Sequence, residues 1–446
     1  MTLQFGTDGV RGVANTDLSP ELVVAFGRAV VRALGRDRAY LIGRDTRRSG
    51  TLIEAALSAG ICSEGGMVEA VGVIPTPGLA FLSQTLDAPA VMISASHNPF
   101  PDNGLKLFAA GGRKIPDAAE REIEAGLLEI LEQGPGDGVA VGGAVGVASR
   151  IPDGTAGYVE HLASSLGGRS LAGVRVVLDC GHGAAFEVAP AALRALGATV
   201  EVCNAEPDGS NINTDCGSTY PGGLQRAVVE LGFDAGLAFD GDADRVVGVD
   251  QNGRLVDGDH ILAVCALDLR SRGLLRHETV VTTVMANLGF RRAMTEHAVT
   301  VVETPVGDRS VLAAMETHDA VLGGEQSGHV IFSELATTGD GTLTGIQLLD
   351  VLVRTGSPLS ELAAVMTVFP QVLRNVRVAD RDGLEGARGF WAAVQAAETR
   401  LGDDARILVR PSGTEPVVRI MVEATDAADA AATAERLERS LLAELG

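Results

Sequence analysis

Short apolar runs alternate along most of the chain with stretches in which apolar residues recur at helical spacing. Residues 39–42, Ala-Tyr-Leu-Ile, predict a buried strand, and residues 52–63 after them have a helical pattern. Similar short apolar runs recur at residues 174–178, 236–239 and 280–284. Strands that alternate with helices are typical of βαβ units, so we expect largely parallel sheets covered by helices.

The pattern changes near residue 366. Residues 372–378 alternate between apolar and polar side chains like a half-exposed strand, and two further strands are expected on either side of residues 410–416. An alanine-rich stretch at residues 426–445 predicts a closing helix. We therefore expect a smaller α+β domain at this end, whereas the glycine-rich residues 134–146 indicate a linker or loop.

Composition limits the classes to which the protein can belong. Its 446 residues are enough for three or four domains, and 46% of them are hydrophobic, so large cores can form. The net charge of −22 argues against non-specific binding to nucleic acid or to anionic membranes. Five scattered cysteines without a C-x-x-C spacing predict reduced thiols rather than disulfides or structural zinc. The sequence shows neither a signal peptide nor a membrane-spanning apolar run, and we expect a soluble, cytoplasmic protein.

Asp240, Asp242 and Asp244 stand at alternate positions in the acidic segment Phe-Asp-Gly-Asp-Ala-Asp-Arg. Side chains two apart lie on one side of an extended chain, so we expect these carboxylates to converge and to need a cation between them. Oxygen ligands of this kind suit Mg²⁺ or Ca²⁺. An EF-hand is excluded, because Arg245 and Gln251 stand where glycine and an acid are required. A solvated acidic turn is the alternative, but the apolar runs on both sides favour a ligand site at a strand end.

A serine follows the apolar run Val-Met-Ile, in the segment Ser-Ala-Ser-His-Asn-Pro. Ser96 could be an ordinary turn residue before His97, and a neighbouring Ser-His pair does not by itself form a hydrolase triad. A serine that carries a phosphoryl group fits better, because it needs a cation and a separate acid or base. The three aspartates could hold the cation, and Lys106 could be the acid or base.

A third polar segment, Arg-Pro-Ser-Gly-Thr-Glu-Pro, begins at Arg410. Glycine and proline bend such a loop so that backbone N–H groups and hydroxyls can converge, and Arg410 adds a guanidinium fork that suits a phosphate. Arg419 follows on the next expected strand. A capped turn is the alternative for this loop.

A fourth segment, Gly-Glu-Gln-Ser-Gly-His, contains Glu325, Ser327 and His329. Its carboxylate, hydroxyl and imidazole could hydrogen-bond a polyhydroxylated ligand. A structural histidine is the alternative for His329.

In this order the four segments resemble those of the α-D-phosphohexomutase superfamily. The segment around Ser96 resembles its phosphoserine loop, residues 240–245 its metal-binding loop, residues 324–329 its sugar-binding loop and residues 410–416 its phosphate-binding loop. Gln326 stands where many relatives that act on neutral hexoses carry methionine, so the likeness is to bacterial members that act on an amino sugar. It covers residues 4 to about 425.

The resemblance implies an α/β fold of four domains around a central cleft. Three α/β domains with mixed sheets would be followed by a C-terminal α+β domain. The expected boundaries are residues 1–150 with the phosphoserine loop, 151–253 with the metal-binding loop, 254–365 with the sugar-binding loop and 366–446 with the phosphate-binding loop.

The same resemblance implies an intramolecular phosphotransferase that interconverts glucosamine 6-phosphate and glucosamine 1-phosphate, a step toward UDP-N-acetylglucosamine and peptidoglycan. Phosphorylated Ser96 would give its phosphoryl group to the substrate, and the resulting 1,6-bisphosphate would turn end for end before it returns the other phosphate. Glucosamine 1,6-bisphosphate or a kinase-type step would prime Ser96. The expected partner is a small sugar phosphate, with a homodimer left open.

Roles for single residues also follow from the resemblance. It implies one Mg²⁺ per chain, held by the three aspartates and by an oxygen of phosphorylated Ser96, and it makes Lys106 the general acid or base. A plain ion pair is the alternative for Lys106, although a chain with 34 arginines and two lysines could have met a need for charge alone with arginine. The catalytic set is completed by Arg11, His97, Arg245 and His329, and the substrate-binding set is Glu325, Ser327, Arg410, Ser412, Gly413, Thr414 and Arg419.

Two other functions stay open. A phosphomannomutase/phosphoglucomutase that acts on neutral hexose phosphates would carry similar loops. A non-catalytic Mg²⁺ or sugar-phosphate binding protein would keep the fold, but we would expect it to have lost one of the four loops, and all four are intact in this sequence.

Overall fold

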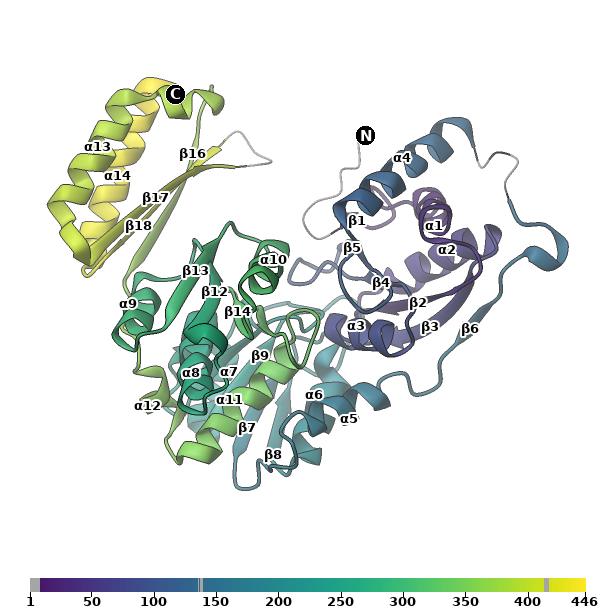
Figure 1. The fold of residues 1–446 in the computed structure, drawn as a ribbon, viewed down its shortest axis with the longest axis horizontal. Helices are drawn as coiled ribbons and strands as arrows, with labels where there is room; N and C mark the ends of the chain where they lie inside the picture. The colour runs from purple at the N-terminus through teal and green to yellow at the C-terminus, as the bar shows by residue number, and fades with distance from the viewer. Residues whose placement is uncertain (1–8, 135, 137–138, 413–416) are drawn as a thin grey trace. The chain divides into compact units, whose positions relative to one another are not determined.

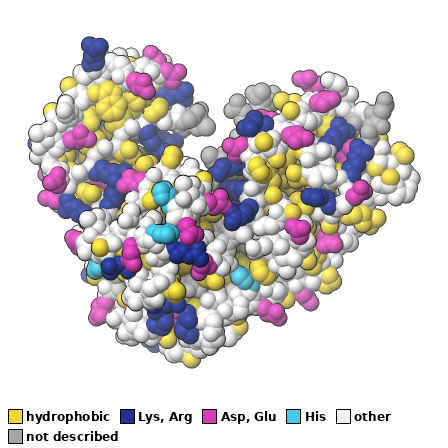
Figure 2. All heavy atoms as spheres, in the orientation of Figure 1, with side chains coloured by type: hydrophobic (Ala, Val, Ile, Leu, Met, Phe, Trp, Pro, Cys, Tyr) yellow, Lys and Arg dark blue, Asp and Glu magenta, His cyan; other side chains and the backbone are white. Residues whose placement is uncertain are grey.

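The structure, a computed structural model, describes residues 9–134, 136, 139–412 and 417–446. The chain forms two compact units (Figure 1). The larger unit consists of Met1–Met285 with Val299–Ala364, and the C-terminal unit consists of Ala286–Ala298 with Val365–Gly446. On the face shown in Figure 2, acidic and basic side chains lie side by side on both units, so the net charge of −22 does not gather there into one acidic patch.

The first sheet of the larger unit has six strands in the order β1-β5-β4-β2-β3-β6. Strands β2, β3, β4 and β6 are parallel, and β5 runs antiparallel to both of its neighbours. Alternate side chains face two separate cores, since Ile42, Val91 and Ile93 pack with helices α1, α2 and α4, while Leu41 and Met92 pack on the other side with α3. The elements are β1 (Val10–Val13), α1 (Pro20–Leu34), β2 (Ala39–Arg44), α2 (Gly50–Ser63), β3 (Met67–Val73), α3 (Thr76–Thr85), β4 (Ala90–Ile93), β5 (Asp102–Phe108), α4 (Asp117–Gln133) and β6 (Ala148–Arg150).

The second sheet has the order β11-β10-β9-β7-β8. Strands β8, β7 and β9 are parallel, whereas β9 and β10 form an antiparallel hairpin whose connection carries the three aspartates. Both hairpin strands are buried along their whole length, which fixes the ends of this connection. The elements are α5 (Ala156–Ser164), β7 (Arg175–Asp179), α6 (Ala185–Ala195), β8 (Thr199–Cys203), α7 (Gly222–Leu231), β9 (Ala235–Phe239), β10 (Val246–Asp250) and β11 (Leu255–Val256).

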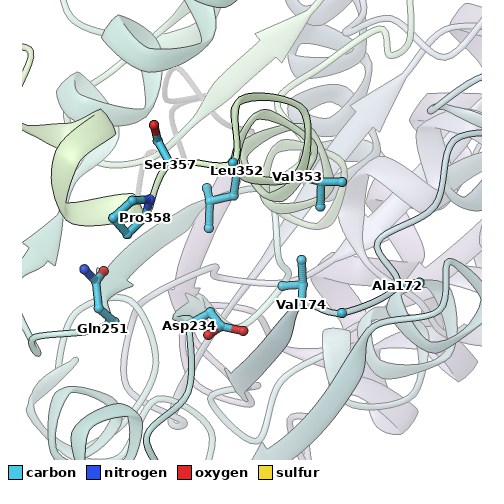
Figure 3. A pocket seen from close by; sticks show the side chains of 10 residues that line it. Ala172, Val174, Asp234, Gln251, Leu352, Val353, Ser357 and Pro358 are labelled. Carbon is cyan, nitrogen blue, oxygen red and sulfur yellow. The ribbon is translucent and has the colours of Figure 1, made fainter.

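The third sheet has the order β13-β12-β14-β15, and the hairpin β14–β15 carries the expected sugar-binding loop. A cavity of about 470 Å³ lies away from this loop, between Val174 and Asp234, which directly precede β7 and β9, and Leu352 in the last turn of α11 (Figure 3). The elements are α8 (Gly258–Ser271), η3 (Arg276–Glu278), β12 (Thr279–Thr283), β13 (Thr300–Thr304), α10 (Asp308–His318), β14 (Leu322–Gly324), β15 (Val330–Phe332), α11 (Gly341–Thr355) and α12 (Leu359–Ala363).

The C-terminal unit is an antiparallel sheet in the order β16-β18-β17 covered by helices. Phe390 of α13, Ile420 of β18 and Leu437 of α14 share its core. Helix α9 belongs to this unit, where Asn287 at its N-cap exchanges hydrogen bonds with the backbone of Phe369. The elements are α9 (Leu288–Glu296), β16 (Gln371–Arg377), η4 (Asp382–Gly386), α13 (Arg388–Leu401), η5 (Gly402–Asp404), β17 (Ala405–Pro411), β18 (Val417–Ala424) and α14 (Ala427–Leu445).

The predicted succession of strands and helices is confirmed. The strand expected at residues 39–42 is β2, the one at 372–378 is β16, and the closing helix is α14. In the glycine-rich stretch 134–146, the described residues contain one short 3-10 turn, η2 (Gly142–Ala144). A search of the described residues for helices long and apolar enough to cross a bilayer finds none.

Candidate active site

Ser96 lies just past the end of β4 and is almost completely buried. Its backbone has φ of +52°, a left-handed conformation that an L-residue holds only where its surroundings impose it. Ser96 N donates to Ser94 Oγ at 2.9 Å, and its own Oγ donates to Asp240 Oδ2 at 2.5 Å. The strained turn thus directs the hydroxyl at the acidic segment of the second sheet.

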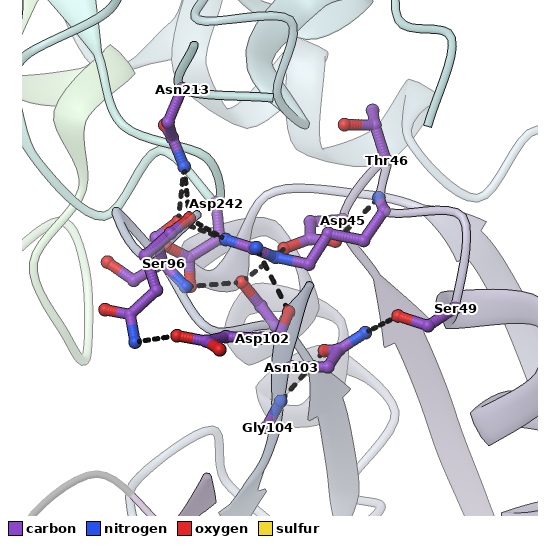
Figure 4. A network of polar contacts seen from close by, with 12 residues as sticks. Asp45, Thr46, Ser49, Ser96, Asp102, Asn103, Gly104, Asn213 and Asp242 are labelled. Carbon is purple, nitrogen blue, oxygen red and sulfur yellow. Dashed lines mark hydrogen bonds and ion pairs between the residues drawn. The ribbon is translucent and has the colours of Figure 1, made fainter. Parts of the chain in front are cut away.

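A buried guanidinium imposes this conformation. Figure 4 shows the network of polar contacts around the serine loop, with Ser96 and Asp45 labelled. Arg47 is 1% exposed, and its Nη2 donates to the carbonyl oxygens of Ser96 and Asn98, both at 2.8 Å. Its Nη1 donates to the carbonyl oxygen of Pro99, and Asp45 holds Nε at 2.9 Å. One side chain from the end of β2 therefore fixes the whole serine loop.

The three aspartates lie in the turn between β9 and β10 and are all buried. One carboxylate oxygen of each lies within 4.8 Å of those of the other two. The expectation that they converge is right, but the expected reason is wrong. The segment is a turn rather than an extended strand, and Ala243 within it has φ of +55°.

Two oxygens of this cluster are left for a ligand. Oδ1 of Asp242 and Oδ1 of Asp244 are buried, and among the described residues neither has a hydrogen-bond partner. Buried carboxylate oxygens are costly unless a donor or a cation satisfies them. Three carboxylates with unused oxygens form a hard-oxygen donor set, so the residues present fit a divalent cation such as Mg²⁺.

The pKa values of Asp240 and Asp244 are shifted in opposite directions. Burial, together with the neighbouring Asp244 and Asp242, raises the pKa of Asp240 well above its usual value. Burial also acts to raise the pKa of Asp244, but the charges of Lys106, His329 and Arg245 outweigh it and hold the pKa well below its usual value. Asp244 is therefore more firmly ionised than Asp240.

Lys106 lies on β5, ten residues after Ser96, and is 5% exposed. Its Nζ donates to Asp242 Oδ2 at 2.6 Å and to Asp244 Oδ2 at 3.3 Å. Asp242 Oδ2 also accepts from the hydroxyl of Thr76, at the start of α3. The lysine thus lies beside both the serine loop and the carboxylates, as either of its predicted roles requires.

His97 and Arg245 face each other beside Ser96. Arg245 Nη1 lies 3.2 Å from His97 Nδ1, which is 3.3 Å from Ser96 Oγ. Burial, and then the charges of Arg245 and Arg11, lower the pKa of His97 to about 4. His97 is therefore neutral at physiological pH, so its Nδ1 can accept the Arg245 hydrogen bond.

His329 lies between two carboxylates. Its Nδ1 is 3.8 Å from Asp244 Oδ2, and its Nε2 is 3.9 Å from Asp308 Oδ2. Burial acts to lower its pKa, but the interactions with Asp244 and Asp308 outweigh it, and the net shift is upward. Lys114 binds the same Asp308 oxygen at 2.5 Å, so the two lysines of the chain lie at opposite ends of one series of charged groups.

The expected sugar-binding loop borders a pocket of about 450 Å³. Glu325, Gln326 and Ser327 line it together with Arg245 and Thr219. Glu325 Oε1 accepts from Gly307 N at 3.0 Å, and its Oε2 accepts weakly from Ser327 Oγ at 3.4 Å. Glu325 and Ser327 are therefore brought together with Arg245, next to the serine and the aspartates.

The expected phosphate clamp lies in the C-terminal unit. Arg410 on β17 and Arg419 on β18 are directly paired across the antiparallel ladder. Burial and the neighbouring Arg419 lower the pKa of Arg410. Ser412 N donates to Val417 O at 2.9 Å and closes the strand pair, whereas Gly413 and Thr414 lie outside the described residues.

Several residues of the site were not predicted from the sequence. Arg47 and Asp45 hold the serine loop, Thr76 binds Asp242, and the side-chain amide of Asn213 donates to Ser96 O at 2.9 Å. A signal was present for two of them, since Asp-Thr-Arg directly follows the strand β2. The carboxyl ends of parallel strands meet at one edge of a sheet, so Asp45 and Arg47 stand at the same edge as Ser96.

Comparison with protein families gives four matches in the order of the sheets. The models for the phosphoglucomutase/phosphomannomutase alpha/beta/alpha domains I, II and III match residues 2–134, 156–253 and 257–369. The model for the C-terminal domain of the same family matches residues 373–440. Together these matches cover most of the chain.

Curated relatives match over nearly the whole length. A protein named phosphoglucosamine mutase from Symbiobacterium thermophilum is 53% identical over 435 residues, which is 96% of each chain. One of the same name from Rhodococcus opacus is 51% identical over 428 residues, which is 95% of each chain. The relatives are thus as long as this chain and align with all four sheets.

Solved structures show the same fold. A phosphoglucomutase/phosphomannomutase family protein from Burkholderia thailandensis has a TM-score of 0.81 at 26% identity, covering 100% of this chain and 98% of the other. A putative phosphomannomutase from Thermus thermophilus has a TM-score of 0.76 at 26% identity, with the same coverage. The chain therefore belongs to the phosphoglucomutase/phosphomannomutase family and has the four-domain α/β architecture of the α-D-phosphohexomutases.

Proposed function

We propose that the chain interconverts glucosamine 6-phosphate and glucosamine 1-phosphate. The observation that carries this proposal is the placement of Ser96, whose buried hydroxyl is 2.5 Å from Asp240 inside a three-carboxylate cluster. A serine in such surroundings suits phosphoryl transfer, in which a cation neutralises the transferred group. The substrate is proposed from the relatives named phosphoglucosamine mutase, which are more than 50% identical over most of the chain.

In the proposed reaction, Ser96 carries a phosphoryl group and gives it to a hydroxyl of the substrate. A bond forms between phosphorus and the substrate oxygen, the bond from phosphorus to Ser96 Oγ breaks, and Oγ keeps the electron pair. The substrate hydroxyl loses its proton, and we assign its acceptance to Lys106, which is buried beside the serine loop and would accept it as a neutral amine once its pairs with Asp242 and Asp244 are broken. Asp240, Asp242 and Asp244 would hold one Mg²⁺, whose charge stabilises the phosphoryl oxygens.

The second half of the reaction returns the other phosphate of a glucosamine 1,6-bisphosphate to Ser96. A substrate that binds in two orientations needs contacts that serve both, and we assign these to Glu325 and Ser327. Arg410, Ser412, Gly413, Thr414 and Arg419 would bind the phosphate that does not react. The bisphosphate, or a kinase-type step, would prime Ser96.

The boundaries proposed for the four domains are residues 1–150, 151–253, 254–365 and 366–446. A homodimer is the proposed assembly, which light scattering tests.

The discriminating experiment is an assay of the 1-phosphates of glucosamine, glucose and mannose under the same conditions, with Mg²⁺ and a bisphosphate primer. We expect the highest kcat/KM for glucosamine 1-phosphate. A preference for glucose or mannose 1-phosphate would replace the proposal with the neutral-hexose alternative. No turnover of any of the three would favour a binding protein.

A further inference from the structure

The sugar-binding loop is pressed against the start of α8, and this contact fixes a side chain that none of the assignments above uses. Gly258 N donates to Gln326 O at 3.0 Å, and a Cβ at Gly258 would lie 2.1 Å from Glu325 O. On the other side, Gly328 O accepts from Val246 N at 3.1 Å. The loop is therefore held from both α8 and β10, so the direction of the Gln326 side chain is set by the fold.

The amide of Gln326 is oriented by Asp257. Gln326 Nε2 donates to Asp257 Oδ2 at 3.3 Å. The other oxygen of Asp257 accepts from His260 N at 3.2 Å and lies 2.6 Å from His260 Nδ1, so the carboxylate is fixed as the N-cap of α8. A carboxylate can only accept, so the opposite orientation of the amide would place two oxygens against each other. Gln326 Oε1 must then face away from Asp257.

This arrangement leaves an acceptor at the wall of the sugar pocket. Gln326 and Asp257 both line the 450 Å³ pocket, and among the described residues none donates to Gln326 Oε1. The acceptor lies next to the carboxylate of Asp257, and the guanidinium of Arg245 also lines the pocket. A cationic donor is favoured beside Gln326 and disfavoured beside Arg245.

We propose that Gln326, oriented by Asp257, binds the ammonium group of the amino sugar and sets the preference over neutral hexose phosphates. This inference rests on the proposed function and adds the specificity-determining residue. An ammonium donates to Oε1 and is attracted by the Asp257 carboxylate behind it. A hydroxyl at the same position also donates to Oε1 but lacks the charge, and charge-assisted hydrogen bonds are roughly twice as strong as neutral ones.

The test compares Gln326→Met with Gln251→Met, a matched control. Gln251 also uses its Nε2 for one side-chain bond, to Ser360 Oγ at 2.6 Å, but it lies at the separate cavity of Figure 3. For each protein, kcat/KM is measured with glucosamine 1-phosphate and with glucose 1-phosphate. We expect Gln326→Met to lower the ratio of the two values about tenfold or more, and Gln251→Met to leave it unchanged.

A second variant tests the positioning role of Asp257. Asparagine caps helices as well as aspartate, so Asp257→Asn keeps the N-cap of α8 but removes the charge and lets the Gln326 amide turn over. We expect the same loss of preference for glucosamine 1-phosphate at an unchanged melting temperature. The difference between variant and parent should shrink at high pH, where the amino group of the substrate is neutral.

The outcomes separate this inference from the proposed function. If the parent protein prefers glucosamine 1-phosphate and Gln326→Met retains that preference, the inference is wrong and the proposed function stands. If Gln326→Met lowers kcat/KM for both substrates equally, Gln326 only supports the loop, and the inference is again wrong. If the parent protein shows no preference for the amino sugar, both fail together.

Discussion

The hydroxyl of Ser96 donates to the carboxylate of Asp240 across 2.5 Å, although the two residues are 144 positions apart in the chain. One belongs to the loop after β4 in the first sheet, and the other to the turn after β9 in the second. The backbones of the two segments are also in close contact, since a Cβ added to Gly241 would lie only 2.5 Å from Ser96 O. The proposed phosphoryl carrier and the proposed cation site are therefore contributed by two different sheets, and they meet only when these sheets are packed together.

The first prediction concerns this serine. Ser96→Ala should fold normally, because it removes one hydroxyl from a loop that Arg47 still holds, but it should lose nearly all mutase activity. Intact mass should show a single added phosphate of roughly 80 Da on the parent protein and none on the variant. Ser58→Ala, which removes a hydroxyl from helix α2, is the control. Turnover in Ser96→Ala within about tenfold of the parent would transfer the role to Ser94.

The cation site gives a second prediction. Removal of divalent ions with EDTA should abolish activity, and Mg²⁺ should restore it. Asp242→Asn should weaken Mg²⁺ binding measured by calorimetry, because it takes one charged ligand from the cluster. Asp234→Asn, which changes a carboxylate paired with Arg175 at the surface, should bind Mg²⁺ like the parent. Full activity in exhaustively chelated protein would contradict the assignment.

A substitution of Lys106 distinguishes a role of its charge from a role in proton transfer. Lys106→Arg keeps a cation opposite Asp242 and Asp244 but removes a group that can give up its proton. We expect kcat to fall by about 10² or more, with folding and Mg²⁺ binding close to those of the parent. The other lysine supplies the matched control, and Lys114→Arg should retain most of kcat. If Lys106→Arg did so too, the lysine would act only through its charge, and His97 or His329 would have to handle the proton.

In the C-terminal unit, Arg410→Ala should chiefly raise KM for the sugar phosphate. The change removes a guanidinium that can bind a phosphate through two hydrogen bonds, a loss of a few kcal/mol at most. Steady-state kinetics measure it, with Arg439→Ala on α14 as a control in which an exposed arginine loses an ion pair with Glu435. An unchanged KM in Arg410→Ala would place the phosphate site elsewhere.

A buried helix cap predicts a dependence of stability on pH. Asp340 caps α11 and accepts from the hydroxyl of Tyr158 at 2.7 Å, and burial raises its pKa from 3.8 to about 6. The raised value means that the folded protein favours the protonated carboxyl. The stability contributed by this group is therefore present below pH 3.8 and is lost as the pH rises through about 6.

Asp340→Asn removes this titration and keeps a capping side chain. The melting temperature of the variant relative to the parent should rise between pH 4.5 and pH 7.5, with a free-energy difference of at most about 3 kcal/mol. Asp426→Asn at the exposed cap of α14 should show a much smaller change, since water solvates that carboxylate. A relative melting temperature that stays constant over this range would show that Asp340 ionises as freely in the folded as in the unfolded chain.

The residues to which we assign the chemistry were easier to predict than those that hold them. Ser96 and the three aspartates follow buried strands, and their residue types point to phosphoryl transfer. Their geometry was not predictable in the same way, because left-handed turns at Ser96 and Ala243 depend on partners from other parts of the chain. Arg47 shows this most clearly, since its role depends on four backbone oxygens about 50 residues away. The pairing of Gln326 with Asp257 is likewise a matter of tertiary structure.

The placement of the two lysines has a practical consequence. Lys106 and Lys114 are ion-paired with Asp242 and Asp308, and their side chains are 6% and 13% exposed. Reagents such as activated esters must reach the amine nitrogen, which burial and these ion pairs shield in both lysines. The surface is instead basic through arginine, which such reagents do not modify. Amine labelling at Lys106 would therefore report the opening of the carboxylate cluster, without the background that surface lysines give in most proteins.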